Sequence, residues 1–290
     1  MKPLKIKTPS NLVDYLLGLG YTKTKVKQLL KHRAIAVNGR TAMRPDQRLS
    51  PNDVVVLDAR PKPGAEILEE ALIGVIYEDD AVIVVNKPPG LLTIATEKEK
   101  KETAYYLLNA YFKARVPSRP DRVFIVHRLD RETSGLIVFA KDEAAKLRMQ
   151  KDWNGAEKRY YAVVEGVPKD REGKIESYLG ETAALKVYSA PGGQESQRAI
   201  TRYRVVKAGD GHALLDVLLE TGKKHQIRVH LADLGCPVLG DKKYGAKTNP
   251  IRRIALHAYH LSFTHPVTGK RMLFTTPLPK AFETLFRRRA

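Results

Sequence analysis

One short polar segment carries the clearest candidates for chemistry in this chain. Residues 127–135 lie between two apolar, β-branched runs, and their Thr-Ser-Gly end has the composition of a tight turn. A loop between two buried strands is a usual place for functional residues. Asp130 is the carboxylate at its centre, with Arg128 and Arg131 as neighbours. Because nearby positive charge favours an ionised carboxylate, we expect Asp130 to be an anion at neutral pH.

A second polar stretch, residues 221–235, combines cations with helical spacing. Its apolar positions 227, 231 and 234 recur at i, i+4 and i+7, which predicts a short helix that buries this side and stops at Gly235. His225 and Arg228 are three residues apart, so they share another face near the start of the helix. This face is the second candidate for chemistry.

The elements expected around these stretches fall into two units. A proline-rich hinge at residues 60–64 separates a basic N-terminal unit from a longer one that is rich in β-branched runs. We expect units at 1–60 and 71–290, joined by a linker at 61–70. In the longer unit the patterns predict strands at 75–85 (two, around an acidic turn), 123–126, 136–140, 158–166, 200–206, 213–219 and 257–261. Helices are expected at 105–112 and after Lys141, and residues 167–198 are expected to be loops with short strands.

The N-terminal unit has its own pattern and charge. It holds twelve Lys or Arg against four Asp or Glu. Leucine and valine spacing predicts helices near residues 12–17 and 24–30, the second capped by Thr22 or Thr24, with strands at 35–37 and 54–57. Asn38-Gly39 predicts a hairpin turn. Six cations crowd the second helix and the turn after it: Lys23, Lys25, Lys27, Lys31, Arg33 and Arg40.

Composition and charge limit the classes of partner and site that this chain can have. The 290 residues carry 51 Lys or Arg, 32 Asp or Glu and a formal net charge of +19, which favours a polyanionic partner, nucleic acid ahead of a membrane surface. A single cysteine, Cys236, excludes an internal disulfide framework and a Cys-based zinc site. The histidine pairs 225/230 and 257/260 lack a carboxylate or cysteine at metal spacing, so we expect no metal. Nucleotide-binding loops and serine-hydrolase motifs are absent from the sequence.

The string from His127 to Leu136 resembles the His-Arg-Leu-Asp-x-x-Thr-Ser-Gly-Leu signature of the RluA-type pseudouridine synthases. The resemblance extends along the chain, through Asn86-Lys87-Pro88-Pro89-Gly90, Lys158-x-Tyr160, residues 221–230, Gly240-Asp241-x-x-Tyr244-Gly245 and the strand at 257–261. One departure is Lys223, where arginine is usual, so the charge is kept but the bidentate fork is lost. Residues 1–60 resemble an S4 RNA-binding domain, with departures at 11–13 and 51–53.

The resemblance implies a function, a fold and roles for single residues. The fold implied is α+β, a pseudouridine-synthase catalytic domain with a mixed, largely antiparallel sheet and flanking helices, preceded by a small S4-like domain. The enzyme implied is an isomerase that converts uridine to pseudouridine in structured RNA without a cofactor. Asp130 would be the catalytic nucleophile or base, Arg228 the cation paired with it, and Tyr160 the aromatic contact to the base. Expected substrate contacts are Arg128, His127, Lys158, His225 and Lys223.

The sequence leaves the chemical path and the exact substrate open. Attack at C1′ or C6 and proton removal at C2′ all need a carboxylate, and the residues do not separate them. The expected partner is RNA, with large-subunit ribosomal RNA ahead of transfer RNA or small-subunit RNA, and no membrane; the expected state is a cytoplasmic monomer. The alternative from another class is a non-catalytic RNA-binding factor in ribosome assembly.

Overall fold

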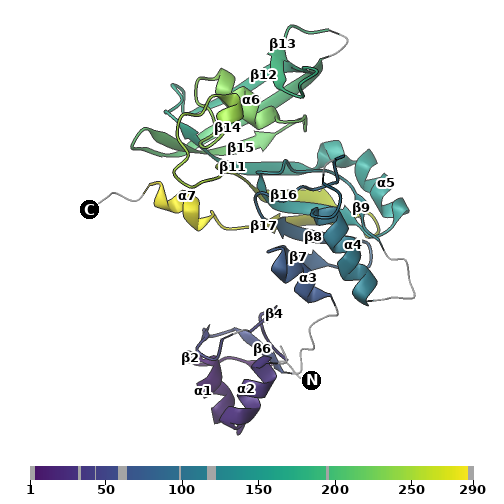
Figure 1. Ribbon diagram of the computed structural model, residues 1–290, viewed down its shortest axis with the longest axis vertical. Helices are drawn as coiled ribbons and strands as arrows, with labels where there is room; N and C mark the ends of the chain where they lie inside the picture. Colours follow the sequence, from purple (N-terminus) through teal and green to yellow (C-terminus); the bar gives the residue numbers. More distant parts are fainter. Residues whose placement is uncertain are drawn as a thin grey trace. The chain divides into compact units, whose positions relative to one another are not determined.

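The computed structural model describes residues 4–31, 34–42, 44–57, 64–97, 99–115, 122–193 and 196–286, without the side chains of Gln28 and Lys31. These residues form two compact units, 1–66 and 67–290 (Figure 1). Arg33 and residues 61–63 of the expected linker lie outside the described residues. Residues 65–70, also expected in the linker, form the helix α3 and bury Leu68. The described helices include none with the length and apolar character that a membrane crossing requires.

The N-terminal unit has the helices and strands that its pattern predicts. Thr22 Oγ1 accepts a hydrogen bond of 3.2 Å from the backbone N–H of Lys25, at the start of the second helix. Asn38 and Gly39 have φ of 51° and 75°, as the tight turn between β3 and β4 requires. Buried side chains of both helices and of β3 and β6 form a core of its own. The elements are β1 (Leu4–Lys5), β2 (Ser10–Asn11), α1 (Leu12–Gly18), α2 (Lys23–Lys31), β3 (Ile35–Val37), β4 (Arg40–Thr41), β5 (Arg48–Leu49) and β6 (Val54–Leu57).

The larger unit is built on one 11-stranded sheet (Figure 1). Its main path runs β13-β12-β14-β15-β11-β16-β10-β8-β7, with β17 paired to β16 and β9 paired to β10. Among the strand pairs of the described residues only β10–β16 is parallel, so the sheet is mixed and largely antiparallel, as predicted. The strands are β7 (Gly74–Glu78), β8 (Val82–Lys87), β9 (Phe124–Ile125), β10 (Ser134–Ala140), β11 (Glu157–Glu165), β12 (Glu172–Glu181), β13 (Val187–Ala190), β14 (Gln197–Gly209), β15 (His212–Leu219), β16 (Leu256–Thr264) and β17 (Arg271–Thr275).

The central strands are buried on both faces because helices cover both. In β10, Ile137 and Phe139 join one core cluster, whereas Val138 joins the other. Apolar residues of α4 pack in the first cluster and those of α5 in the second, so continuous apolar runs in β8 and β10 are required. The remaining helices, including short 3₁₀ turns, are α3 (Ala65–Glu70), α4 (Ala104–Arg115), α5 (Glu143–Lys151), η1 (Trp153–Gly155), α6 (Gln226–Asp233), η2 (Lys242–Tyr244) and α7 (Lys280–Thr284).

Two further features differ from the sequence prediction. The segment expected to be poorly patterned contains β12, a ten-residue strand whose residues alternate between exposed and half-buried over most of its length. Its half-buried positions are Gly173, Ile175 and Ser177, which do not form the apolar repeat that marks a strand in a sequence. The run at 123–126 keeps only Phe124 and Ile125 in a strand, because the chain must turn there toward the Asp130 loop.

The start of β10 fixes where the Asp130 loop leaves the sheet. Gly135 has φ of 117°, and a Cβ at this position would lie 2.2 Å from the carbonyl oxygen of Ala258 in β16. Only glycine allows the two parallel strands to approach this closely. The polar loop before Gly135 is therefore set at the centre of the sheet.

Candidate active site

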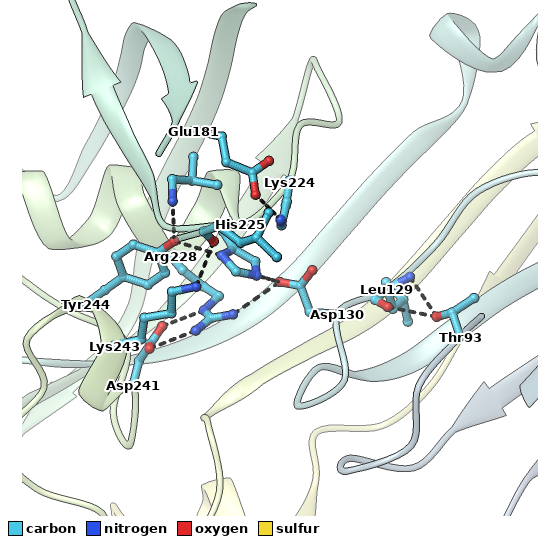
Figure 2. Close-up of polar contacts among 12 residues, drawn as sticks. Thr93, Leu129, Asp130, Glu181, Lys224, His225, Arg228, Asp241, Lys243 and Tyr244 are labelled. Atoms are coloured by element: carbon cyan, nitrogen blue, oxygen red, sulfur yellow. Dashed lines mark hydrogen bonds and ion pairs between the residues drawn. The ribbon is translucent and has the colours of Figure 1, made fainter. Parts of the chain in front are cut away.

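The Asp130 loop is clamped on both sides of the carboxylate. Before it, Thr93 Oγ1 donates to the carbonyl of Leu129 at 2.7 Å and accepts from its N–H at 3.1 Å (Figure 2). After it, the carbonyl of Arg131 accepts from the N–H of Gly90 at 2.9 Å and from Lys87 Nζ at 3.1 Å. A side chain fixed through its neighbours' backbone presents its carboxylate with little freedom, which favours a preorganised site.

Lys87 is the part of this clamp that sequence reasoning did not single out. Its side chain is fully buried, and Nζ also donates to the carbonyls of Pro88 and Leu91 at 2.8 and 2.7 Å. Burial lowers the pKa of Lys87 to about 7, against the opposing charges of Glu132 and Asp130. The Asn-Lys-Pro-Pro-Gly turn thus has a structural task, since it carries the lysine that holds the loop.

Arg228 joins the Asp130 loop to the start of α6. Its Nη1 lies 3.5 Å from Asp130 Oδ2, and the Asp130 side chain is 21% exposed. On its other side Arg228 makes two shorter hydrogen bonds to Asp241, of 2.6 and 2.9 Å (Figure 2). Burial disfavours the charged form, but Asp241 and the charge of Asp130 outweigh it and raise the pKa of Arg228. The guanidinium is therefore anchored by Asp241 and turns one remaining edge toward Asp130.

His225 approaches Asp130 from the same helix start. Its backbone is left-handed, with φ of 54°, and its Nε2 lies 3.9 Å from Asp130 Oδ2. Its Nδ1 is 2.7 Å from the hydroxyl of Tyr244, which accepts from the N–H of Val187 at 3.2 Å. Burial lowers the pKa of His225 to about 4, so the ring is neutral near pH 7. A Tyr244 hydroxyl that donates to Nδ1 leaves the Nε2–H facing the carboxylate.

Asp130 faces a cavity of about 340 Å³, at the lower end of the range for small-molecule sites. Tyr160, on β11, is buried at 7% exposure, and burial together with the charge of Asp130 raises the pKa of its phenol. The phenol therefore stays protonated at neutral pH. All eight catalytic and substrate candidates from the sequence line this cavity: Asp130, Arg228, Tyr160, Arg128, His127, Lys158, His225 and Lys223.

The candidates in the N-terminal unit are not part of this cavity. Lys23, Lys25 and Lys27 are exposed on α2, and Arg40 is exposed on β4. Neither Arg33 nor the side chain of Lys31 is described. The exposed cations fit contacts to a polyanion, and their role stays a prediction.

Three further residues belong to the site: Asp241 and Tyr244 hold Arg228 and His225, and Trp153 lines the cavity itself. Asp241 and Tyr244 belong to the Gly-Asp-x-x-Tyr-Gly turn that the sequence contains, and their polar side chains were the signal available. Trp153, the single tryptophan of the chain, lines the cavity and contacts His127 with ring centroids 4.6 Å apart. Sequence reasoning did not place Trp153 there, because η1 precedes β11 without a recognisable motif.

Comparison with known proteins identifies the family. A family model described as RNA pseudouridylate synthase matches residues 81–233, and an S4 domain model matches residues 11–55. An RNA pseudouridine synthase of Bacillus subtilis, described as uncharacterized, is 31% identical over 93% of this chain and 90% of its own. The ribosomal large subunit pseudouridine synthase D of Neisseria meningitidis serogroup A is 35% identical over 89% of this chain and 72% of its own.

Solved structures agree with this assignment. The human RNA pseudouridylate synthase domain containing 4 protein superposes with a TM-score of 0.63 at 25% identity, covering 76% of this chain and 94% of that one. The chain therefore belongs to the RNA pseudouridine synthase family and is an isomerase that acts on RNA, with an S4 domain at its N-terminus.

Proposed function

We propose that this enzyme isomerises a uridine of large-subunit (23S) ribosomal RNA and that Asp130 is its catalytic carboxylate. The observation that carries the proposal is a half-buried carboxylate, oriented by Arg228 and His225, at the wall of a 340 Å³ cavity. Relatives from Neisseria meningitidis and Vibrio cholerae are named ribosomal large subunit pseudouridine synthase D. Their names support the choice of RNA.

The proposed roles follow from the contacts. Isomerisation breaks the N1–C1′ bond and joins C5 to C1′, and Asp130 acts as nucleophile at C1′ or C6 or as base at C2′. Asp241 holds the Arg228 guanidinium at 2.6 Å, and this guanidinium lies 3.5 Å from the Asp130 carboxylate and orients it in the cavity. Tyr160 supplies an aromatic ring with a protonated hydroxyl against the base.

RNA binding adds two requirements. A uridine inside folded RNA must be extruded before it can enter a cavity of this kind, and the flanking strand must be held. Arg128 is exposed and Lys223 half-buried at the cavity, where both suit phosphate contacts. The exposed cations Lys23, Lys25, Lys27 and Arg40 of the S4 domain extend the basic surface. We further propose a cytoplasmic monomer, since one chain supplies every residue of the cavity.

The test is pseudouridine mapping in cells that lack this protein. Ribosomal and transfer RNA are treated with carbodiimide and read by primer extension after complementation with wild type, Asp130→Asn or the exposed control Asp80→Asn. We expect one or more 23S sites to be lost in the deletion strain. Wild type and Asp80→Asn restore them, whereas Asp130→Asn does not.

Other results would redirect the proposal. Sites lost only in transfer RNA or in small-subunit RNA would assign the substrate to that class. Restoration by Asp130→Asn would exclude Asp130 as the catalytic carboxylate. Unchanged modification in every RNA would favour an RNA-binding factor of ribosome assembly.

A further inference from the structure

Lys158 is a buried cation without a partner in the described parts of the chain. Its side chain lies on β11 and lines the Asp130 cavity at 8% exposure. No hydrogen bond or ion pair joins its ammonium to a described residue, and burial alone lowers its pKa. The adjacent Glu157 pairs with Arg159 at 2.7 Å instead. The stem of Lys158 is buried, whereas its ammonium opens onto the cavity, so this position suits an acceptor that a ligand brings.

Two neutral donors stand beside Lys158. His127 Nε2 accepts from the N–H of Val138 at 3.2 Å, so its hydrogen lies on Nδ1. Burial and the charge of Lys158 lower the pKa of His127 to about 3, which keeps the ring neutral. The Trp153 ring contacts His127 and lies 5.8 Å from Lys158 Nζ. No described residue accepts a hydrogen bond from His127 Nδ1 or from the Trp153 indole. We call Lys158, His127 and Trp153 the donor cluster.

The donor cluster shares its cavity with Asp130 and Tyr160. Lys158 and Tyr160 are two residues apart on β11, so both side chains project from the same face of the sheet. The charge of Asp130 raises the pKa of Tyr160. Lys158 and Trp153 reach the cavity from β11 and η1, whereas Asp130 reaches it from the loop before β10.

Every route open to this reaction places negative charge on the uracil ring. When Asp130 attacks C1′, or takes the C2′ proton so that a C1′–C2′ double bond forms, N1–C1′ breaks and its electron pair goes to the ring. When Asp130 adds to C6, the electron pair of the C5=C6 bond moves toward the C4 carbonyl oxygen. In the C6 route N1–C1′ then breaks as well. In every route C5 bonds to C1′, C5 loses a proton and N1 gains one, and Asp130 is released from C1′ or C6 or returns the proton to C2′. The charge therefore rests for a time on O2 or O4.

We propose that the donor cluster binds a carbonyl oxygen of the target uracil and stabilises the negative charge that develops on it, with Lys158 as its cation. The proposal rests on the proposed function of the Asp130 cavity. Donors that the fold holds in place stabilise such an oxyanion more than water does, because they need no reorganisation when the charge develops. Backbone phosphate is the competing ligand for a cation in an RNA enzyme. Arg128 and Lys223 line the same cavity with more exposure, so they suit phosphate better than the buried Lys158.

The experiment combines protein variants with single-atom changes in the RNA. The substrate is a synthetic fragment around a uridine that wild type modifies, carrying uridine, 2-thiouridine or 4-thiouridine at that position. A fourth fragment has a methylphosphonate at the neighbouring phosphate. Single-turnover rates and fragment affinities are measured for wild type, Lys158→Met, Lys158→Arg and Trp153→Phe. Lys169→Met, at an exposed lysine, is the matched control.

The expected pattern is a loss in rate without a matching loss in affinity. Lys158→Met lowers the rate on uridine by about 100-fold, as removal of one oxyanion donor does elsewhere. Lys158→Arg recovers part of the rate, and Trp153→Phe loses less because it removes one neutral donor. On one of the two thiouridine fragments, Lys158→Met is expected to lower the rate by no more than about fivefold relative to wild type. Sulfur accepts hydrogen bonds poorly, so the contact is already weakened there and the two changes are not additive.

Three results would overturn the proposal. A loss that shrinks only with the methylphosphonate would assign Lys158 to backbone phosphate. If the rate losses from Lys158→Met and from each RNA change simply add, Lys158 does not contact the changed atom, and its role is structural. An unchanged rate for Lys158→Met would exclude it from the reaction. In the same assay an active Asp130→Asn variant would overturn the proposed function of the cavity, whatever the Lys158 variants do.

Discussion

Arg228 and Lys158 are two buried cations of one cavity, and their surroundings are opposite. Arg228 is 6% exposed and bound by Asp241 through two hydrogen bonds, with Asp130 at 3.5 Å. Lys158 is 8% exposed, lies 5.8 Å from the Trp153 ring, and forms no ion pair with any residue that the structure describes. Equal burial with unequal pairing separates two tasks. A paired cation is held in one orientation in the folded site, as Arg228 is beside Asp130. An unpaired one is retained at a cost in stability, which points to a use in binding or catalysis.

The largest test of this comparison is a pair of substitutions whose effects on stability have opposite signs. Asp241→Asn leaves Arg228 without its main partner, so the free energy of unfolding falls by about 3–5 kcal/mol, as for other broken buried pairs. Lys158→Met replaces a buried charged side chain by an apolar one of similar volume and leaves no partner without its counter-charge. The free energy of unfolding therefore rises by about 1 kcal/mol. Urea unfolding of the full chain measures both. A lower free energy of unfolding for Lys158→Met would mean that Lys158 has a stabilising partner. It would contradict the contrast with Arg228.

The pH dependence of stability should also differ between Arg228 and Lys158, with a smaller effect. Burial lowers the pKa of Lys158 and lowers that of Lys87 to about 7. The unfolded chain, with lysine pKa values near 10.4, then binds more protons than the folded chain between pH 7 and about 10. The free energy of unfolding therefore rises with pH across this window. The cost of burying the charged lysines is fully present below their pKa in the folded chain. Arg228 contributes nothing here, because its raised pKa lies above the window.

The measurement is urea unfolding of wild type and Lys158→Met between pH 7 and 10. We expect a smaller rise in the variant, since one of the lysines with a lowered pKa is gone. Lys169→Met, which removes an exposed lysine, should keep the full rise. Identical pH dependence in wild type and Lys158→Met would contradict the burial of an unpaired charge at this position.

The smallest effect on stability is expected for cations that are neither paired nor buried. Lys23, Lys25, Lys27 and Arg40 are exposed, so replacing all four by glutamine should leave the urea midpoint unchanged. RNA affinity should fall, and the slope of log affinity against log salt should flatten by about one unit for each phosphate that the protein no longer neutralises. Filter binding at several salt concentrations measures the slope. An unchanged slope would remove these residues from the RNA interface.

Much of the fold could be predicted because burial leaves a periodic record in the sequence. Continuous apolar runs marked β8 and β10, helical spacing marked α6, and Asn38-Gly39 marked the first hairpin. The elements that the sequence does not predict are those that bury few apolar side chains. The strand β12 lies toward the edge of the sheet and buries little, so its alternation is weak. Residues 65–70 form a helix that buries Leu68 alone, which is too little to stand out beside a proline-rich segment.

The residue types and their spacing indicate which chemistry is available: a carboxylate among cations in a loop between strands, two polar residues at the start of a helix, and a basic N-terminal unit. Which of these charges meet depends on how the strands are ordered in the folded chain. Asp241 follows Arg228 by thirteen residues and Thr93 precedes Leu129 by thirty-six, and no local period connects such pairs. The partners of a side chain depend on strand order and on close approaches such as that at Gly135. For this reason, the pairing of Arg228 and the isolation of Lys158 became visible only in the folded chain.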